Sequence, residues 1–97
     1  MRIISRKTLK VFWEKHKETE EQLASWYSEA HKSKWKTPKE IKVEYPKASI
    51  IGDNRVVFNI CGNNYRLLVK VNYQRGWVFI KFIGTHQEYN KINAEKI

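Results

Sequence analysis

The sequence predicts an α+β domain, with an N-terminal pair of helices on one face of a sheet that is mostly antiparallel. Two observations predict this class. Before residue 48, apolar residues recur every three or four positions, after residues that favour a helix start. After residue 48, apolar and polar residues alternate in runs separated by Gly-containing turns. The 97 residues can form one modest core, so we expect a single domain over 1–97.

The N-terminal half begins with a predicted strand and a predicted helix. Met1 to Ser5 is interpreted as a short first strand. The i, i+3, i+4, i+7 spacing of an amphipathic helix then occurs at Leu9, Phe12, Trp13 and His16.

Two further helix starts follow. Thr19 and Gln22 match a capping box with acidic residues between them, so a second helix is expected to begin there. Its apolar stripe consists of Leu23, Trp26, Tyr27 and Ala30. The short break between these two helices predicts a helical hairpin. A third capping box, at residues 37–40 with Pro38 at its first helical position, predicts a short helix that ends at Tyr45-Pro46.

Three strands are predicted in the C-terminal half, at residues 55–61, 64–73 and 77–83. Gly62-Asn63 and Arg75-Gly76 are expected to form two-residue hairpin turns between them. A one-residue slip in either turn would carry a charged side chain into the core, so the register is strongly constrained. The predicted cross-strand pairs are Asn59–Arg66, Arg55–Lys70 and Lys70–Lys81.

This register divides the sheet into two faces. The face expected to pack under the helices is apolar and consists of Val56, Phe58, Ile60, Tyr65, Leu67, Val69, Val71, Tyr73, Val78, Ile80 and Phe82. The other face is basic and polar, with apolar residues between the cations: Arg55, Asn59, Arg66, Lys70, Asn72 and Lys81, with Val57, Leu68, Phe79 and Ile83. Like charges directly opposite each other repel, which favours an anion bound on this face. The alternative is a solvated face that carries Lys for solubility.

The composition favours a polyanionic partner. Nineteen basic and ten acidic side chains give a net charge of +9, spread along the whole chain. No apolar run reaches membrane-spanning length and no signal peptide is recognisable, so a cytosolic protein without membrane association is expected. One cysteine, Cys61, excludes an internal disulfide. No metal-ligand spacing, phosphate loop or dinucleotide motif occurs, so neither a metal nor a cofactor is expected.

The last segment combines groups that can cleave RNA. Thr85 and Glu88 form a capping box that places His86 at the first position of a helix, where the helix dipole favours the neutral, basic imidazole. Tyr89 shares that helix face and can donate a proton or stack on a base. Arg66 is the best phosphate clamp, because a guanidinium binds phosphate oxygens with two parallel hydrogen bonds. The alternatives are that His86 only caps the helix and that Tyr89 only anchors it.

Two stretches of the chain, residues 55–67 and 82–92, together with the order of elements, resemble the RelE-like toxins and, within them, the HigB branch. The resemblance covers essentially the full length. It implies a toxin of a bacterial toxin–antitoxin module, which cleaves mRNA on the translating ribosome. It also implies a cognate antitoxin with a helix-turn-helix domain, through which the complex would bind its own operator DNA.

Carried over by position, the resemblance implies a site formed by Asn59, Arg66, His86 and Tyr89. The RNA-binding residues expected around it are Lys36, Arg55, Lys70 and Lys81. The cleavage expected is metal-free acid–base chemistry, which leaves a 2′,3′-cyclic phosphate and a 5′-hydroxyl. The alternatives are a non-catalytic RNA- or ribosome-binding module and a structural partner of an acidic protein. Because the first two helices hold large aromatic residues, we expect the antitoxin to dock near them and to block activity sterically.

Overall fold

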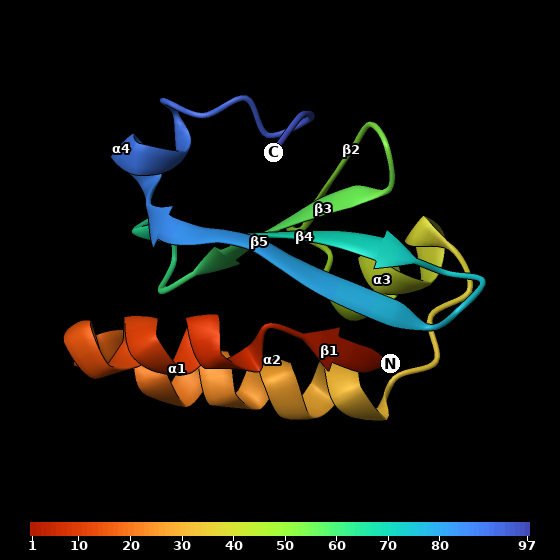
Figure 1. The fold of residues 1–97 in the computed structure, drawn as a ribbon, viewed down its shortest axis with the longest axis horizontal. Helices are drawn as coiled ribbons and strands as arrows, with labels where there is room; N and C mark the ends of the chain where they lie inside the picture. The colour runs from red at the N-terminus through yellow and green to blue at the C-terminus, as the bar shows by residue number, and fades with distance from the viewer.

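A five-stranded sheet in the order β1-β5-β4-β3-β2 lies at the centre of the molecule, and the α1–α2 hairpin covers one of its faces (Figure 1). β1 is parallel to β5, and the other neighbouring strands are antiparallel. The computed structural model describes all of residues 1–97 and confirms the predicted α+β class. The elements are β1 (Arg2–Ile4), α1 (Arg6–Lys15), a 3₁₀ turn (Lys17–Thr19), α2 (Glu20–Lys32), α3 (Pro38–Glu44), β2 (Ser49–Ile51), β3 (Arg55–Ile60), β4 (Tyr65–Asn72), β5 (Trp77–Thr85) and α4 (His86–Tyr89). No helix has both the length and the apolar character needed to cross a membrane.

The helical hairpin buries the apolar stripes that the sequence predicts. Its buried residues join those of the sheet in one core: Leu9 and Trp13 from α1, and Leu23, Trp26 and Ala30 from α2. The ring of Trp26 meets that of Phe58 edge to face, with 5.3 Å between centroids. This contact holds α2 against β3.

Helix α2 begins at Glu20, but the predicted capping box at its start does not form. The Thr19 hydroxyl is buried and donates to the carbonyl oxygen of His16 at 2.7 Å, and it accepts no hydrogen bond from the backbone of α2. Gln22, the expected second member of the box, instead bonds the backbone of β3. The helix is therefore positioned by tertiary contacts in place of its local motif.

The register of the β3–β4 hairpin is as predicted, with Asn59 opposite Arg66 and Arg55 opposite Lys70. The predicted pairing of Lys70 with Lys81 is wrong, because Lys70 lies opposite Phe79. The β4–β5 connection has four residues, 73–76, and is closed by a 2.9 Å hydrogen bond from the N–H of Gly76 to the oxygen of Asn72. A β-bulge further along β5 then reduces this shift from two residues to one.

The bulge lies at Lys81, between the pairs Val69–Ile80 and Leu68–Phe82. An extra residue in one strand shifts the alternation of side chains beyond it. Ile83 accordingly packs against the core and Phe82 leaves it, so the predicted faces of these two residues are exchanged. Before the bulge the predictions hold, since Val69 and Ile80 are buried and Lys81 is exposed.

Strand β2 is a short edge strand that the sequence analysis does not predict, because three residues are too few to display an alternation. It pairs antiparallel with the start of β3. Asp53 and Asn54 in the connecting turn both have positive φ, 57° and 60°, a conformation that Asp and Asn adopt more readily than other non-glycine residues.

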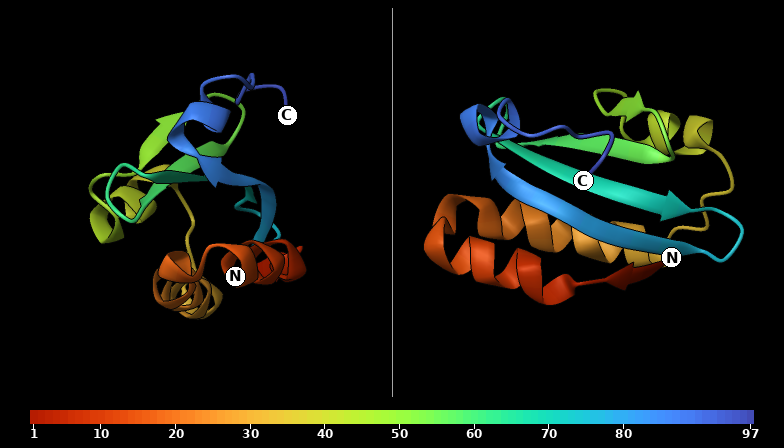
Figure 2. Two further views of the ribbon diagram at one scale, coloured as in Figure 1. Left: turned by 90° about the vertical axis from the view of Figure 1, so that its left-hand side faces the viewer. Right: turned by 45° about the horizontal axis from the view of Figure 1, so that its top comes forward.

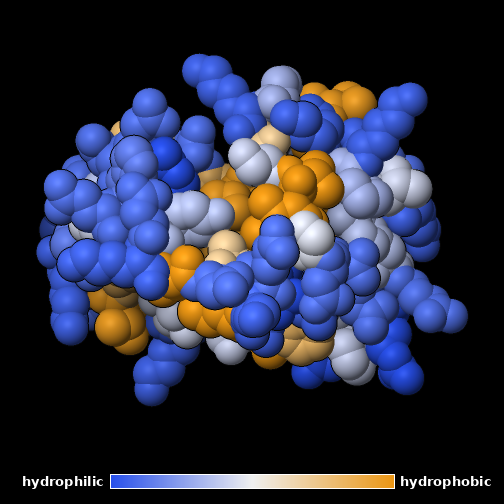
Figure 3. Space-filling model, turned by 90° about the horizontal axis from the view of Figure 1, so that it is seen from above, coloured by the Kyte–Doolittle hydropathy of each residue, from blue (hydrophilic) through white to orange (hydrophobic).

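The face opposite the helices is only partly open. The segment after α4, residues 90–97, runs back across it (Figures 1 and 2), and the backbone oxygen of Ile97 accepts a 2.5 Å hydrogen bond from Arg55 Nη2. Val57 and Leu68, which belong to this face, are buried. The same side in Figure 3 has apolar surface near its centre and hydrophilic side chains around it. The exposed cationic part of the face is thus smaller than the sequence predicts.

Candidate active site

One end of the sheet brings together residues from three strands and α4. Arg66 on β4 lies opposite Asn59 on β3 and opposite Gly84 on β5. The backbone N–H of His86 donates to the oxygen of Asn64 at 3.0 Å, which fixes the start of α4 beside the β3–β4 turn. The predicted residues Asn59, Arg66 and His86 are therefore gathered at the same end of the molecule.

The guanidinium of Arg66 is hydrogen-bonded only to neutral groups. Nη1 donates to the backbone oxygens of Asn63 at 3.0 Å and Tyr65 at 3.2 Å, and Nη2 donates to Asn63 Oδ1 at 3.5 Å. No carboxylate forms a salt bridge with it. Arg66 thus keeps its full positive charge, in a fixed and partly exposed position, for an anionic ligand.

The capping box at the start of α4 forms as predicted. Thr85 Oγ1 accepts from the N–H of Glu88 at 3.1 Å, and Glu88 Oε1 accepts from the N–H of Thr85 at 2.8 Å. The pair fixes the direction of a helix that has only four residues, so that the exposed His86 lies at its first position. The hydrogen bond that the N–H of Thr85 donates to the carboxylate is the main reason that the pKa of Glu88 lies below its ordinary value.

This capping box predicts a local response to acid. Because the folded pKa of Glu88 is lowered, its ionised carboxylate stabilises α4 fully above the ordinary value of 4.5, and the effect is lost as pH falls through the folded pKa. We expect the NMR shift of the Thr85 amide proton to titrate below pH 4.5. In a Glu88→Gln control, which keeps an acceptor without an ionisable group, the titration should disappear. A Thr85 amide that titrates equally in both proteins would contradict the capping account.

Tyr89 lies in an aromatic pair that the sequence analysis misses. Its half-buried ring is 6.2 Å from that of Phe82, which the bulge has turned onto this face. Gly84 leaves room for the pair, since a Cβ there would lie 2.7 Å from the Phe82 ring and 2.8 Å from Glu88 Oε1. Phe82 and Gly84 are thus additional candidate site residues. Predicting them would have required predicting the bulge, for which the sequence contains no signal.

Arg55 and Lys70 share the carboxylate of Asp53. Asp53 Oδ2 is 2.6 Å from Arg55 Nη1 and 3.5 Å from Lys70 Nζ. The hydrogen bond from Arg55, then the charge of Lys70, lowers the pKa of Asp53. The Asp53 carboxylate offsets the repulsion between Arg55 and Lys70, which was the reason to expect a bound anion on this face. Arg55 is only 5% exposed and also bonds Ile97, so its guanidinium is not open to RNA phosphates.

Lys70 and Lys81 line a second region of the same face, apart from Arg66. They border a hollow of about 580 Å³ together with Phe79 and Asn72. Lys81 Nζ is 5.7 Å from the centre of the Phe79 ring. Cations beside an accessible aromatic ring suit a nucleic acid strand, because phosphates and bases can be bound together.

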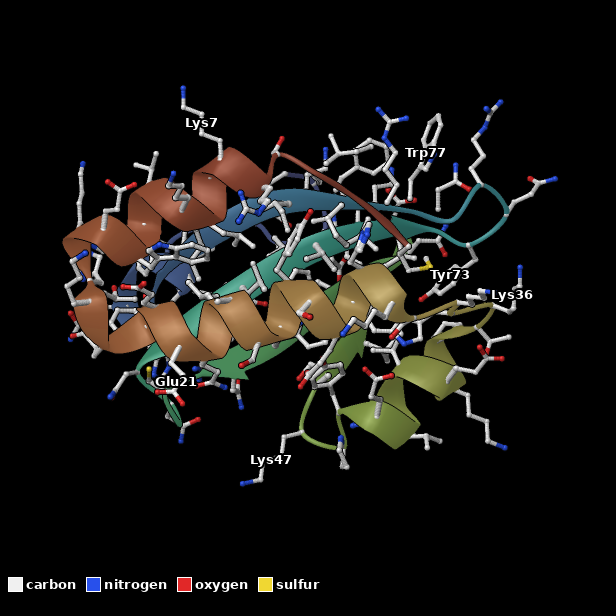
Figure 4. All side chains as sticks on the ribbon, turned by 90° about the horizontal axis from the view of Figure 1, so that it is seen from below. Lys7, Glu21, Lys36, Lys47, Tyr73 and Trp77 are labelled. Carbon is white, nitrogen blue, oxygen red and sulfur yellow. The ribbon has the colours of Figure 1, made fainter.

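Lys36 is not part of this end of the sheet. It lies with Tyr73 at the far end of the molecule from α4 (Figure 4). There it borders a hollow of about 450 Å³, and the other basic residues in the lining are Arg2, Lys34 and His31. No three His, Cys, Asp or Glu side chains are grouped as a metal-binding set.

The mixed sheet, the N-terminal helical hairpin and the short last helix together have the architecture of a RelE-like toxin. A family model described as HigB toxin, the RelE-like toxic component of a toxin–antitoxin system, matches residues 19–92. The chain therefore belongs to the HigB toxin family.

Individual relatives agree with this membership. The mRNA interferase toxin HigB of Escherichia coli K12 is 28% identical over 96 residues, which cover 97% of this chain and 92% of the relative. The mRNA interferase HigB proteins of Escherichia coli O157:H7 and Shigella flexneri match with the same identity and coverage.

Proposed function

We propose that the chain is an mRNA interferase, an endoribonuclease toxin that cleaves mRNA on the translating ribosome in the cytoplasm. Family membership and the names of the relatives support the toxin and nuclease parts of the proposal. The observation that carries it is the uncompensated guanidinium of Arg66 beside the start of α4. Cleavage by a ribose 2′-hydroxyl needs a cation, a base and an acid, the roles that we assign to Arg66, His86 and Tyr89.

In the proposed reaction no metal takes part. His86 removes the proton of the 2′-hydroxyl, whose oxygen attacks the adjacent phosphorus. Arg66 binds the phosphate oxygens as their charge increases, with the Asn59 amide beside it. The bond from phosphorus to the 5′-oxygen breaks, and Tyr89 supplies the proton to that oxygen. The products are a 2′,3′-cyclic phosphate and a 5′-hydroxyl.

Basic residues outside this centre would hold the RNA. Lys70 and Lys81, with Phe79 between them, can bind the mRNA backbone and a base on the same face. Lys36 is too far along the molecule to reach the same phosphate, and we assign it with Arg2 and Lys34 to a contact with ribosomal RNA. The net charge of +9 favours contacts with both the mRNA and the ribosomal RNA.

The partner that silences the toxin is the antitoxin that family membership implies. We propose that it carries a helix-turn-helix domain and that the complex binds its operator DNA through that domain.

Two incubations of the purified chain test this function. One contains mRNA-programmed ribosomes, and the other contains the same mRNA free in solution. We expect cleavage on the ribosome, with 5′-hydroxyl and 2′,3′-cyclic phosphate ends, and little cleavage of free RNA. Equal cleavage of free RNA would contradict ribosome dependence. Products with 5′-phosphate ends would contradict the 2′-hydroxyl mechanism, and ribosome binding without cleavage would support a non-catalytic module.

A further inference from the structure

The ring of Phe82 lies across Gly84, at the position of β5 that faces Arg66. Arg66 pairs with Gly84 and Leu68 pairs with Phe82. Residues directly opposite each other on neighbouring strands share one face of a sheet, so Phe82 and Arg66 lie on the same face. A Cβ at Gly84 would be 2.7 Å from Cζ and 3.2 Å from Cε2 of the Phe82 ring. The ring therefore extends along β5 to the place opposite the candidate phosphate clamp.

Phe82 is held in place without being enclosed. Its ring packs against that of Tyr89, with 6.2 Å between centroids and 50° between the planes. Both side chains are partly exposed, and neither belongs to the core that the sheet shares with the helical hairpin. A partly exposed aromatic ring on a cationic surface suits stacking on a nucleic acid base.

One carboxylate lies close to this ring. Glu88 Oε1 would be 2.8 Å from a Cβ at Gly84, but it accepts the N–H of Thr85 and forms no salt bridge with Arg66. A stacked base carries no charge, so this carboxylate does not repel it, and the guanidinium of Arg66 remains for the phosphate. Neighbouring strands lie about 4.8 Å apart, a separation that the sugar of one nucleotide can bridge.

We propose that Phe82 stacks on the base of the nucleotide that follows the cut, while Arg66 holds the phosphate that is cut. The inference rests on the proposed function, which assigns this phosphate to Arg66. The nucleotide after the cut is expected because Tyr89, which packs against Phe82, is assigned to protonate its 5′-oxygen. Stacking on an aromatic side chain strengthens the binding of a base roughly tenfold to a hundredfold, so Phe82 would fix the scissile bond relative to the attacking group.

Photocrosslinking tests this contact without requiring cleavage. 5-Iodouracil, which crosslinks to an aromatic side chain stacked on it, is placed in turn at each position of a ribosome-bound codon made uncleavable by 2′-deoxynucleotides. We expect a crosslink to Phe82, identified by mass spectrometry, at the position after the cut. Phe82→Tyr keeps a ring and should retain the crosslink, whereas Phe82→Leu should lose it. A crosslink to Tyr89 alone, or none at this position, would overturn the proposal.

The rate of cleavage distinguishes base stacking from a role of Phe82 in supporting Tyr89. Single-turnover assays compare mRNA that has a base after the cut with mRNA that has an abasic site there. Loss of the base and Phe82→Leu should each slow cleavage about tenfold, and together little more than either alone, because both remove the same contact. Effects that multiply to about a hundredfold would show that Phe82 acts through Tyr89, and the proposal would be wrong.

Phe79→Leu, at another partly exposed position of β5, is the matched control. It should weaken the binding of both RNAs equally and leave the response to the abasic site at about tenfold. A Phe82 crosslink in a protein that never cleaves mRNA would overturn the proposed function and not the stacking. Normal cleavage without that crosslink would overturn the stacking alone.

Discussion

Replacing Arg66 with alanine is expected to relieve growth arrest by the toxin and to slow cleavage of ribosome-bound mRNA about a hundredfold. The reason is that Arg66 is held by neutral oxygens and has no carboxylate partner, so its charge is available to the phosphate in the transition state. Growth after induction and single-turnover cleavage on programmed ribosomes measure the two effects.

Two matched variants distinguish phosphate binding by Arg66 from a non-specific effect of positive charge. Arg75→Ala removes the same group from an exposed position on the four-residue β4–β5 turn, at the other end of the sheet, and should leave most activity. Arg66→Lys keeps the charge but loses the two parallel hydrogen bonds, so an intermediate rate is expected. Full toxicity in a folded, equally expressed Arg66→Ala protein would remove Arg66 from the mechanism.

The largest expected effect on stability comes from Leu67→Ala. Leu67 lies in the middle of β4, is fully buried, and belongs to the core shared by the sheet and the helical hairpin. Truncation of a buried leucine to alanine removes apolar contacts and leaves a cavity, which costs about 2–5 kcal/mol. Denaturant unfolding of the two proteins, monitored by tryptophan fluorescence, gives the difference in free energy of unfolding.

Lys70→Ala, on the same strand, is the control. Lys70 is partly exposed, and its contact with Asp53 at 3.5 Å is a surface ion pair. Such pairs contribute about 0–1 kcal/mol, so the free energy of unfolding should change little. A loss at Lys70→Ala as large as that at Leu67→Ala would show that the charged cluster, not the core, stabilises β4.

The features that could be predicted from the sequence are those determined by neighbouring residues. The Thr85–Glu88 box closes within four residues, and the β3–β4 register follows from one tight turn and the cost of burying Arg66. Helical and strand periodicity placed the core correctly up to the bulge in β5, because side-chain direction alternates with a fixed period in each type of element.

The features that could not be predicted depend on distant contacts. The length of the β4–β5 turn and the bulge at Lys81 together shift Phe82 onto the site face, although a two-residue turn matches the local sequence equally well. Asp53 reaches Arg55 only because β2 forms and turns through two residues of positive φ. Gln22 matches a capping motif, but its amide is bound by the unpaired edge of β3.

The central claim is tested most directly with a ribosome-bound mRNA that carries a single 2′-deoxynucleotide at the cut position. If the Arg66 and α4 site uses the 2′-hydroxyl as nucleophile, the deoxy position should not be cut, while unmodified mRNA is cleaved to a 2′,3′-cyclic phosphate. Cleavage at the deoxy position at the unmodified rate would contradict this, since it would mean that water, and not the ribose, attacks the phosphate.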